Sequence, residues 1–281
     1  MKLVRYGRPG KEKPGLIDAA GKLRDLSEVV ADIDAASLAP RSLARLVKIK
    51  PESLPAVRGA PRIGPCVGNI GNFVAVGLNY ADHARETGAA IPSEPVLFNK
   101  HTSCIVGPDD DVIIPKASTK CDWEVELAIV IGETAEYVSE DAALDYVAGY
   151  AVCHDVSERA FQLEHGTQWM KGKGCPTFGP LGPWLVTPEE IADVQSLGLW
   201  LDVNGERRQT GNTSTMIFGV KTLVSYISQF MRLIPGDVIT TGTPPGVGIG
   251  MKPPRFLKPG DVVTLGVDSL GSQRQVFKAY Q

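Results

Sequence analysis

Short apolar runs separated by glycine and proline make up most of the chain. Residues 197–203 and 207–210 flank Asn204-Gly205, a two-residue turn sequence typical of a β-hairpin. Pro-Gly-Asp sequences at 235–237 and 259–261 each precede an apolar run and predict a tight turn into a strand. Only residues 218–231 carry a long apolar face at helical spacing. The pattern predicts a mixed α/β, β-rich fold (a roll or sandwich) without regular strand–helix alternation.

The first part of the chain has a different pattern. Residues 2–6 and 14–18 predict strands, and residues 33–49 predict short helical pieces interrupted by a proline. Glycine and proline then cluster between residues 61 and 71, as they do at domain boundaries. We therefore expect a small N-terminal domain over residues 1–68 and a larger β-rich domain over residues 69–281.

Composition excludes several classes of function. The formal net charge is −3 and no basic stripe is present, so a nucleic-acid partner is not expected. No apolar run approaches the ~20 residues that span a bilayer, so no membrane partner is expected, and the N-terminus lacks the apolar core of a signal peptide. The five cysteines form no CxxC pair, which favours reduced thiols in a cytoplasmic protein (Cys66, Cys104, Cys121, Cys153 and Cys175).

Three carboxylates form the strongest chemical signal. In an extended segment Glu124 and Glu126 point to one face, where two neighbouring carboxylates repel unless a cation neutralises them. Asp155 lies at the end of the predicted strand 150–155 and would complete an all-oxygen site of the kind that Mg²⁺ prefers. The alternative is the solvated outer face of an edge strand.

A histidine and a glutamate form a second candidate pair. Asn79 follows an apolar strand and can cap a helix that carries His83 and Glu86. Their spacing of three places both side chains on one helical face, where the carboxylate can orient the imidazole as a general base for water. The alternative is a surface turn with an incidental ion pair.

The remaining candidates would contact a substrate. If Ser157 caps a helix, Arg159 and Gln162 share a face and could bind a carboxylate and a carbonyl, although Arg159 alone could equally be a surface charge. Lys173 lies in a glycine-rich run, where its charge could stabilise developing negative charge on a bound molecule. Thr243 offers a hydroxyl from a second glycine-rich loop.

Taken together and in this order, these motifs resemble the fumarylacetoacetate hydrolase family. The resemblance covers roughly residues 70–281 and rests on five ordered stretches, Gly77–Glu86, Asp122–Leu127, Asp155–Gln162, Gly172–Trp184 and Thr240–Gly248.

The resemblance implies a β-roll catalytic domain, a homodimer, and a divalent cation that is commonly Mg²⁺, with Mn²⁺ or Ca²⁺ as alternatives. It assigns three roles to nine residues: metal ligands (Glu124, Glu126, Asp155), catalytic groups (His83, Glu86, Lys173) and substrate contacts (Arg159, Gln162, Thr243). Cys175-Pro176 departs from the Phe-Asp that the family often has after the lysine.

At a finer level, Met1–Asp18 and Gly64–Glu86 resemble the branch that acts on 2,4-diketo-3-deoxy-L-rhamnonate and L-fuconate. The implied substrate is a small diketo acid, and the implied reaction cleaves its C3–C4 bond to give pyruvate and a hydroxy acid such as lactate. Two alternatives stay open. One is an oxaloacetate decarboxylase or another metal-enolate lyase or isomerase with the same site. The other is a catalytically silent member that only binds small carboxylates, for which the Cys175-Pro176 departure is the one argument.

Overall fold

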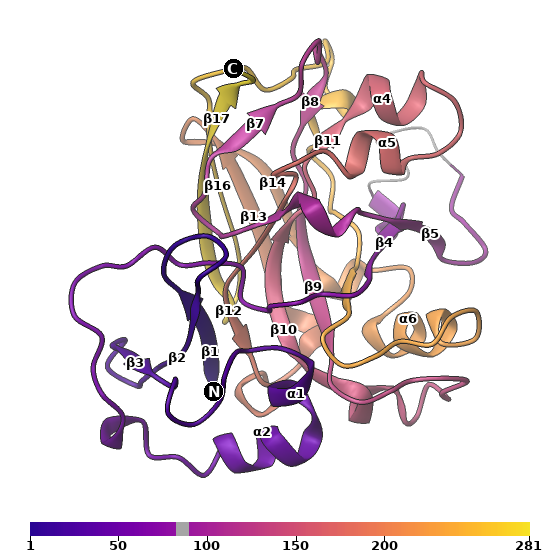
Figure 1. Cartoon of the computed structure of the whole chain (residues 1–281). Coiled ribbons are helices and arrows are strands. Elements are labelled where there is room, and N and C mark those ends of the chain that lie inside the picture. The colour runs from indigo at the N-terminus through magenta and orange to yellow at the C-terminus, as the bar shows by residue number, and fades with distance from the viewer. Residues whose placement is uncertain (83–89) are drawn as a thin grey trace.

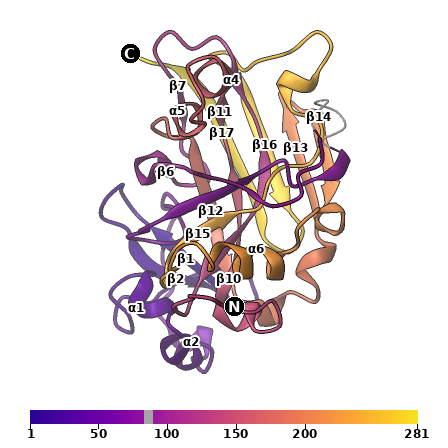
Figure 2. The same ribbon diagram turned by 90° about the vertical axis from the view of Figure 1, so that its right-hand side faces the viewer.

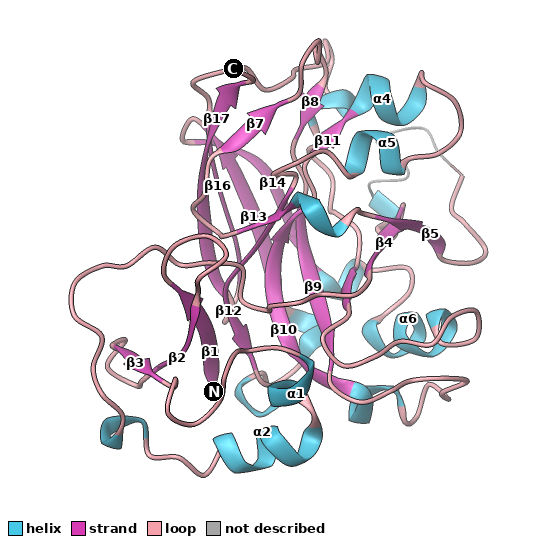
Figure 3. Ribbon diagram, viewed as in Figure 1, coloured by secondary structure: helices cyan, strands magenta, loops and turns pink. Residues whose placement is uncertain are grey.

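The computed structural model describes residues 1–82 and 90–281, and strands dominate it (Figure 3). Most strands belong to one large mixed sheet. In the described part of the chain, nine of its strands are hydrogen-bonded in a continuous order, and a tenth, β6 (Ile105–Val106), pairs with one of them, β12 (Gly179–Val186). That order is β3 (Leu23–Asp25), β2 (Lys13–Ile17), β1 (Lys2–Tyr6), β12 (Gly179–Val186), β10 (Val147–His154), β9 (Val125–Ile131), β15 (Val238–Thr240), β4 (Phe73–Gly77) and β5 (Val96–Asn99).

A second sheet packs against the first. It contains β14 (Glu206–Asn212), β13 (Gly198–Val203), β16 (Val262–Val267), β17 (Gly271–Ala279) and β7 (Val112–Ile114). Strand β9 contacts β13 and β16, and β12 contacts β17, so the main core lies between the two sheets. Every residue of β9 and β10 is buried, as their nearly continuous apolar sequence requires. The mixed, strand-rich fold predicted from the sequence is confirmed.

The predicted turns and hairpin are present. Strands β13 and β14 pair across Asn204-Gly205. Gly236 and Gly260 have φ angles of +88° and +98°, which the third position of a type II turn requires, and β15 and β16 begin two residues later.

The helices are short and lie at two ends of the molecule. In both views α1 (Ala35–Leu38) and α2 (Pro40–Leu46) lie at the bottom, whereas α4 (Arg159–Leu163) and α5 (Met170–Lys173) lie at the top (Figures 1 and 2). The helix expected over residues 218–231 is α6 (Val220–Ile227), which begins after Gly219 in extended backbone. Among the described residues, no helix is long and apolar enough to cross a membrane.

The N-terminal strands are part of the large sheet. Backbone pairing of Lys2 with Val186 and of Leu3 with Leu185 joins β1 to β12. Residues 1–68 therefore fold onto the larger part of the chain through hydrogen bonds, while a domain boundary at residue 68 stays a prediction.

Candidate active site

A cavity of about 590 Å³ opens beside α4 and α5, near β4 and β5 at the upper right of Figure 1. Seven of the residues singled out in the sequence line it or lie at its wall. Six of them line the cavity directly (Glu124, Glu126, Arg159, Gln162, Lys173 and Thr243), and Asp155 is hydrogen-bonded to Lys173 behind them.

The three carboxylates meet because β9 and β10 are antiparallel. Glu126 lies opposite Cys153, and two residues further along the amide of Asp155 donates to the carbonyl of Glu124. Ligand atoms of Glu124, Glu126 and Asp155 lie within 4.8 Å of one another, and all three side chains are buried. The alternative of a solvated outer strand face is therefore wrong.

The local backbone differs from the expectation of one continuous strand. Glu124 precedes β9, and the preceding β8 (Cys121–Asp122) pairs instead with β11 (Ser157–Glu158). The chain changes partner at Trp123-Glu124, and this places the Glu124 carboxylate beside α4. Asp122 belongs to the same site. It lies two residues before Glu124, and this spacing could have indicated in the sequence that the two carboxylates lie together.

Arg159 is the centre of a buried hydrogen-bond network. Its Nε donates to Asp122 Oδ2 at 2.8 Å, and one terminal nitrogen donates to Glu124 Oε1 at 2.6 Å. The other donates to Gln162 Oε1 at 3.0 Å. Because Gln162 uses its oxygen for Arg159, its Nε2 hydrogens are the donors that remain for a ligand.

The start of α4 was predicted incorrectly. Glu158, rather than Ser157, caps the helix, since Glu158 Oε2 accepts from the amide of Phe161 at 2.6 Å. Ser157 lies in β11, and its hydroxyl donates to the Asp155 carbonyl. The expected proximity of Arg159 and Gln162 at a spacing of three is present nevertheless.

Two buried ammonium groups hold the carboxylates. Lys173 Nζ lies 2.7 Å from both Glu124 Oε2 and Asp155 Oδ2. Lys100 Nζ lies 2.5 Å from Asp155 Oδ1, and its side chain has no solvent exposure. Burial alone would lower the pKa of Lys100, but the Asp155 carboxylate raises it above its ordinary value, so the amine stays charged. Lys100 was missed in the sequence because no local motif marks it.

Buried acidic groups outnumber buried basic groups in the described part of the site. Four carboxyl groups (Asp122, Glu124, Glu126 and Asp155) face three cations (Lys100, Arg159 and Lys173). Burial, together with the charges of Asp155 and Glu124, raises the pKa of Glu126 well above its usual range. Three buried carboxylates at this spacing, one of them disfavoured as an anion, fit a hard divalent cation.

The loop after β15 closes the other side of the site. The amide of Gly242 donates to Glu126 Oε2 at 2.9 Å. The Thr243 hydroxyl donates to the Val125 carbonyl and accepts from Gln209 Nε2, both at 2.8 Å. Thr243 has thus used its one hydroxyl hydrogen, so its hydroxyl can only accept from a ligand. Gln209, on the second sheet, was not recognised in the sequence.

The predicted His83–Glu86 pair lies outside the described residues. Among the described residues, the side chain of Asn79 bonds elsewhere: its Oδ1 accepts from the amide of Phe218, and its Nδ2 donates to the Phe218 and Thr241 carbonyls. Asn79 therefore joins two loops.

His154 lies outside the site, although Asp155 follows it. Its Nδ1 is 2.9 Å from Gln275 Oε1, and its Nε2 has no hydrogen-bond partner among residues 1–82 and 90–281. Burial lowers the pKa of His154 to about 4, so the ring is neutral in the core.

Comparison with known proteins places this site in a family. Residues 72–278 match the model of the fumarylacetoacetate (FAA) hydrolase C-terminal region. A Burkholderia cenocepacia protein named as a hydrolase is 60% identical over 276 residues, which cover 98% of each chain.

Solved structures share the fold over the full length of both chains. A fumarylacetoacetate hydrolase from Exiguobacterium antarcticum is 35% identical, with a TM-score of 0.88. A Mycobacterium abscessus protein described as a 2-hydroxyhepta-2,4-diene-1,7-dioate isomerase is 32% identical, with a TM-score of 0.85. A maleylpyruvate hydrolase from Sphingobium, solved with manganese and pyruvate, is 24% identical with a TM-score of 0.84. This last comparison shows a shared fold. The match over residues 72–278 and the 60% identity to a full-length relative show that the chain belongs to the fumarylacetoacetate hydrolase family.

Proposed function

We propose that this protein is a divalent-cation-dependent hydrolase that cleaves the C3–C4 bond of a 2,4-diketo acid and releases pyruvate. The observation that carries the proposal is the group of three buried carboxylates within 4.8 Å of one another, with Lys173 and Gln162 facing the same cavity. A 2,4-diketo-3-deoxy acid of the L-rhamnonate or L-fuconate type, which would give lactate as second product, is the substrate that the resemblance of Met1–Asp18 and Gly64–Glu86 supports.

Glu124, Glu126 and Asp155 would hold the cation, which we expect to be Mg²⁺, with Mn²⁺ or Ca²⁺ as alternatives. When bound, such an ion supplies Lewis acidity toward the oxygens of a neighbouring carboxylate and carbonyl. Manganese and pyruvate in the Sphingobium maleylpyruvate hydrolase support both the kind of cation and the proposed product.

The side chains around the cavity have separate tasks in this reaction. Gln162 Nε2 would donate to the 2-oxo acid end of the substrate, and Arg159 fixes its orientation. Water adds to the C4 carbonyl, the C3–C4 bond breaks, and C3 takes up a proton as pyruvate forms. The Lys173 ammonium would stabilise the negative charge that develops on the pyruvate part. His83, oriented by Glu86, is the base that the family resemblance predicts for the water.

An isomerase or decarboxylase is the second candidate. The 32% identity to the Mycobacterium abscessus isomerase favours it, because the same cavity could stabilise the same enolate without adding water. Decarboxylation of oxaloacetate and double-bond migration in a 2-hydroxydiene-dioate are the two reactions to compare with cleavage.

The deciding experiment measures pyruvate release from 2,4-diketo-3-deoxy-L-rhamnonate, and separately from acetylpyruvate, with Mg²⁺ and with EDTA. Metal-dependent release from either compound establishes the hydrolase, and the ratio of the two rates tests the sugar-acid assignment. A Glu126→Gln variant should lose the release, while Lys171→Met, at an exposed lysine near the cavity, should keep it. If neither compound is cleaved but oxaloacetate loses CO₂ or the diene isomerises, the hydrolase proposal is wrong.

A further inference from the structure

The outer half of the cavity is lined by apolar side chains that are only partly buried. They come from four separate parts of the chain: the end of β4, β5, the α4–α5 segment and the turn at 248–251. The six are Leu78, Phe98, Leu163, Trp169, Ile249 and Met251. A gathering of exposed apolar surface in one concave site is what a ligand with an apolar part would cover.

Apart from Lys252, the polar and charged side chains that line the cavity are buried, unlike this apolar wall. The change from buried polar to exposed apolar side chains occurs between two adjacent residues of helix α4. Gln162 is buried against Arg159, whereas Leu163 is 51% exposed. The ammonium of Lys173 marks the border, because it contacts Glu124 on one side and lies 5.2 Å from the centre of the Phe98 ring on the other.

Trp169 packs against two other parts of the cavity wall. Its ring meets Phe98 edge to face, with 5.4 Å between centroids and an interplanar angle of 61°. A Cβ added to Gly77 would lie 2.4 Å from Trp169 Cζ3, so the glycine is needed for the indole to take this place. The adjacent Leu78 has a φ of +53°, a conformation that a bulky residue seldom adopts and that places strain beside the cavity.

We propose that this wall binds the acyl group of the substrate and selects acyl groups that end in hydrocarbon over groups that are hydroxylated to their end. The inference rests on the proposed function, since it takes the carboxylate end of the cavity as the binding place of the 2-oxo acid. Among deoxy sugar acids it favours those that end in a methyl group. A hydroxyl at the far end would lose water and find no partner among these six side chains.

The energetic expectation is a dependence of affinity on chain length. Each methylene that moves from water to such a wall should tighten binding by about two- to fourfold. A polar group buried there without a partner should weaken binding by about tenfold.

Calorimetric binding of non-cleavable 2-oxo acids to the Mg²⁺-loaded protein tests this directly. We expect affinity to rise steadily from pyruvate through 2-oxobutanoate and 2-oxopentanoate to 2-oxohexanoate. The thioether 4-methylthio-2-oxobutanoate and its sulfoxide form a matched pair that differs by one oxygen, and the thioether should bind about tenfold more tightly. Equal affinities along the series, equal affinities within the pair, or no binding at all would overturn the inference.

Lys252 provides the competing explanation, because it is the one cation on the outer wall among the described residues. If Lys252 binds a second carboxylate of the substrate, 2-oxoadipate should bind more tightly than 2-oxohexanoate. Such a result would overturn the proposal that the wall selects hydrocarbon groups. We expect the reverse order.

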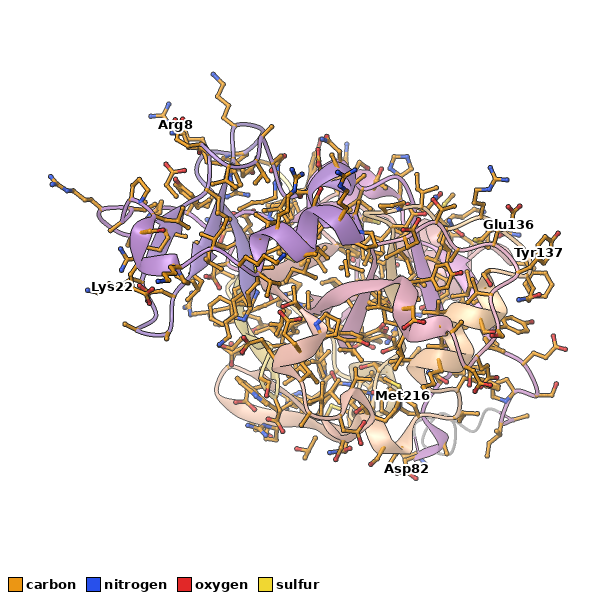
Figure 4. All side chains as sticks on the ribbon, turned by 90° about the horizontal axis from the view of Figure 1, so that it is seen from below. Arg8, Lys22, Asp82, Glu136, Tyr137 and Met216 are labelled. Atoms are coloured by element: carbon orange, nitrogen blue, oxygen red, sulfur yellow. The ribbon has the colours of Figure 1, made fainter. Side chains whose placement is uncertain are left out.

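Two substitutions locate the effect. Trp169→Ala and the milder Phe98→Leu should both flatten the dependence on chain length, and thermal unfolding shows whether each variant is folded. Tyr137→Ala is the matched aromatic control, since Tyr137 is 73% exposed and lies at the edge of the molecule (Figure 4). Failure of the proposed function is a separate result: it would appear as a normal chain-length dependence without pyruvate release from any diketo acid.

Discussion

The buried Lys100 ammonium joins Asp155 to the backbone of Lys173. Its Nζ lies 2.5 Å from Asp155 Oδ1 and 2.5 Å from the carbonyl oxygen of Lys173, a residue that lines the cavity. One cation from the residue after β5 thus holds a proposed metal ligand and the backbone of Lys173, the proposed catalytic lysine, at the same time.

Replacing this lysine should therefore disturb folding and the site together. We expect Lys100→Met to lower the free energy of unfolding of the metal-free protein by ~3 kcal/mol, because the Asp155 carboxylate stays buried without one of its partners. Mg²⁺ should restore part of this loss. Denaturant unfolding with EDTA and with Mg²⁺ measures both, and Lys278→Met, at an exposed lysine on β17, is the control. An unchanged stability would show that the contact contributes nothing.

The positive charge of Lys173 should weaken binding of the cation while it assists the reaction. Because its ammonium lies 2.7 Å from both Glu124 and Asp155, Lys173→Met should tighten Mg²⁺ binding by about tenfold or more. The same change should lower turnover by about 10²–10³-fold, since a stabilising charge is lost.

Isothermal titration with Mg²⁺ and a pyruvate-release assay separate the two effects of this substitution. Lys171→Met changes a lysine of the same helix that lies at the surface and should alter neither quantity. Weaker metal binding in Lys173→Met would contradict the proposed arrangement.

The raised pKa of Glu126 predicts how the free energy of unfolding depends on pH when no metal is bound. Burial and the charges of Asp155 and Glu124 raise its pKa in the folded state above the ordinary value near 4.5, so the folded protein holds this proton more tightly than the unfolded chain. Stability should then fall as pH rises from about 4.5 through the folded pKa, by ~1.4 kcal/mol for each pH unit in that interval.

Unfolding of the wild type and of Glu126→Gln in EDTA over this pH range checks the prediction. The difference between the two proteins should shrink as pH falls, and Mg²⁺ should abolish the decline in the wild type. Parallel profiles in EDTA would mean that the Glu126 carboxyl is not perturbed.

His154 should act in the opposite direction, between about pH 4 and pH 6.5. Burial lowers its pKa to about 4, so below pH ~6.5 the unfolded chain binds a proton that the folded protein excludes. This contribution to stability, up to about 3 kcal/mol, is present above pH ~6.5 and is lost as pH falls toward 4. His154→Gln should remove that part of the acid sensitivity, which unfolding curves across the window would measure. NMR titration of the ring provides a second readout, and protonation near pH 6 would refute the prediction.

The sequence by itself determined the features that depend on local spacing. The hairpin at Asn204-Gly205 and the two Pro-Gly-Asp turns follow from the backbone conformations that glycine allows. The contact between Arg159 and Gln162 follows from helical geometry even though α4 begins later than expected. The ordered motifs were also sufficient to identify the family.

Only the tertiary structure decided which distant residues share the cavity. Asp155 reaches Glu124 through the register of β9 and β10, and a shift of one residue would have turned its side chain to the other face. Lys100 carries no local signal, because a lysine at a strand end is usually solvated, and only its enclosure beside Asp155 gives it a role. The apolar wall around Trp169 likewise comes from four segments that are adjacent only after folding, so no spacing in the sequence could have predicted it.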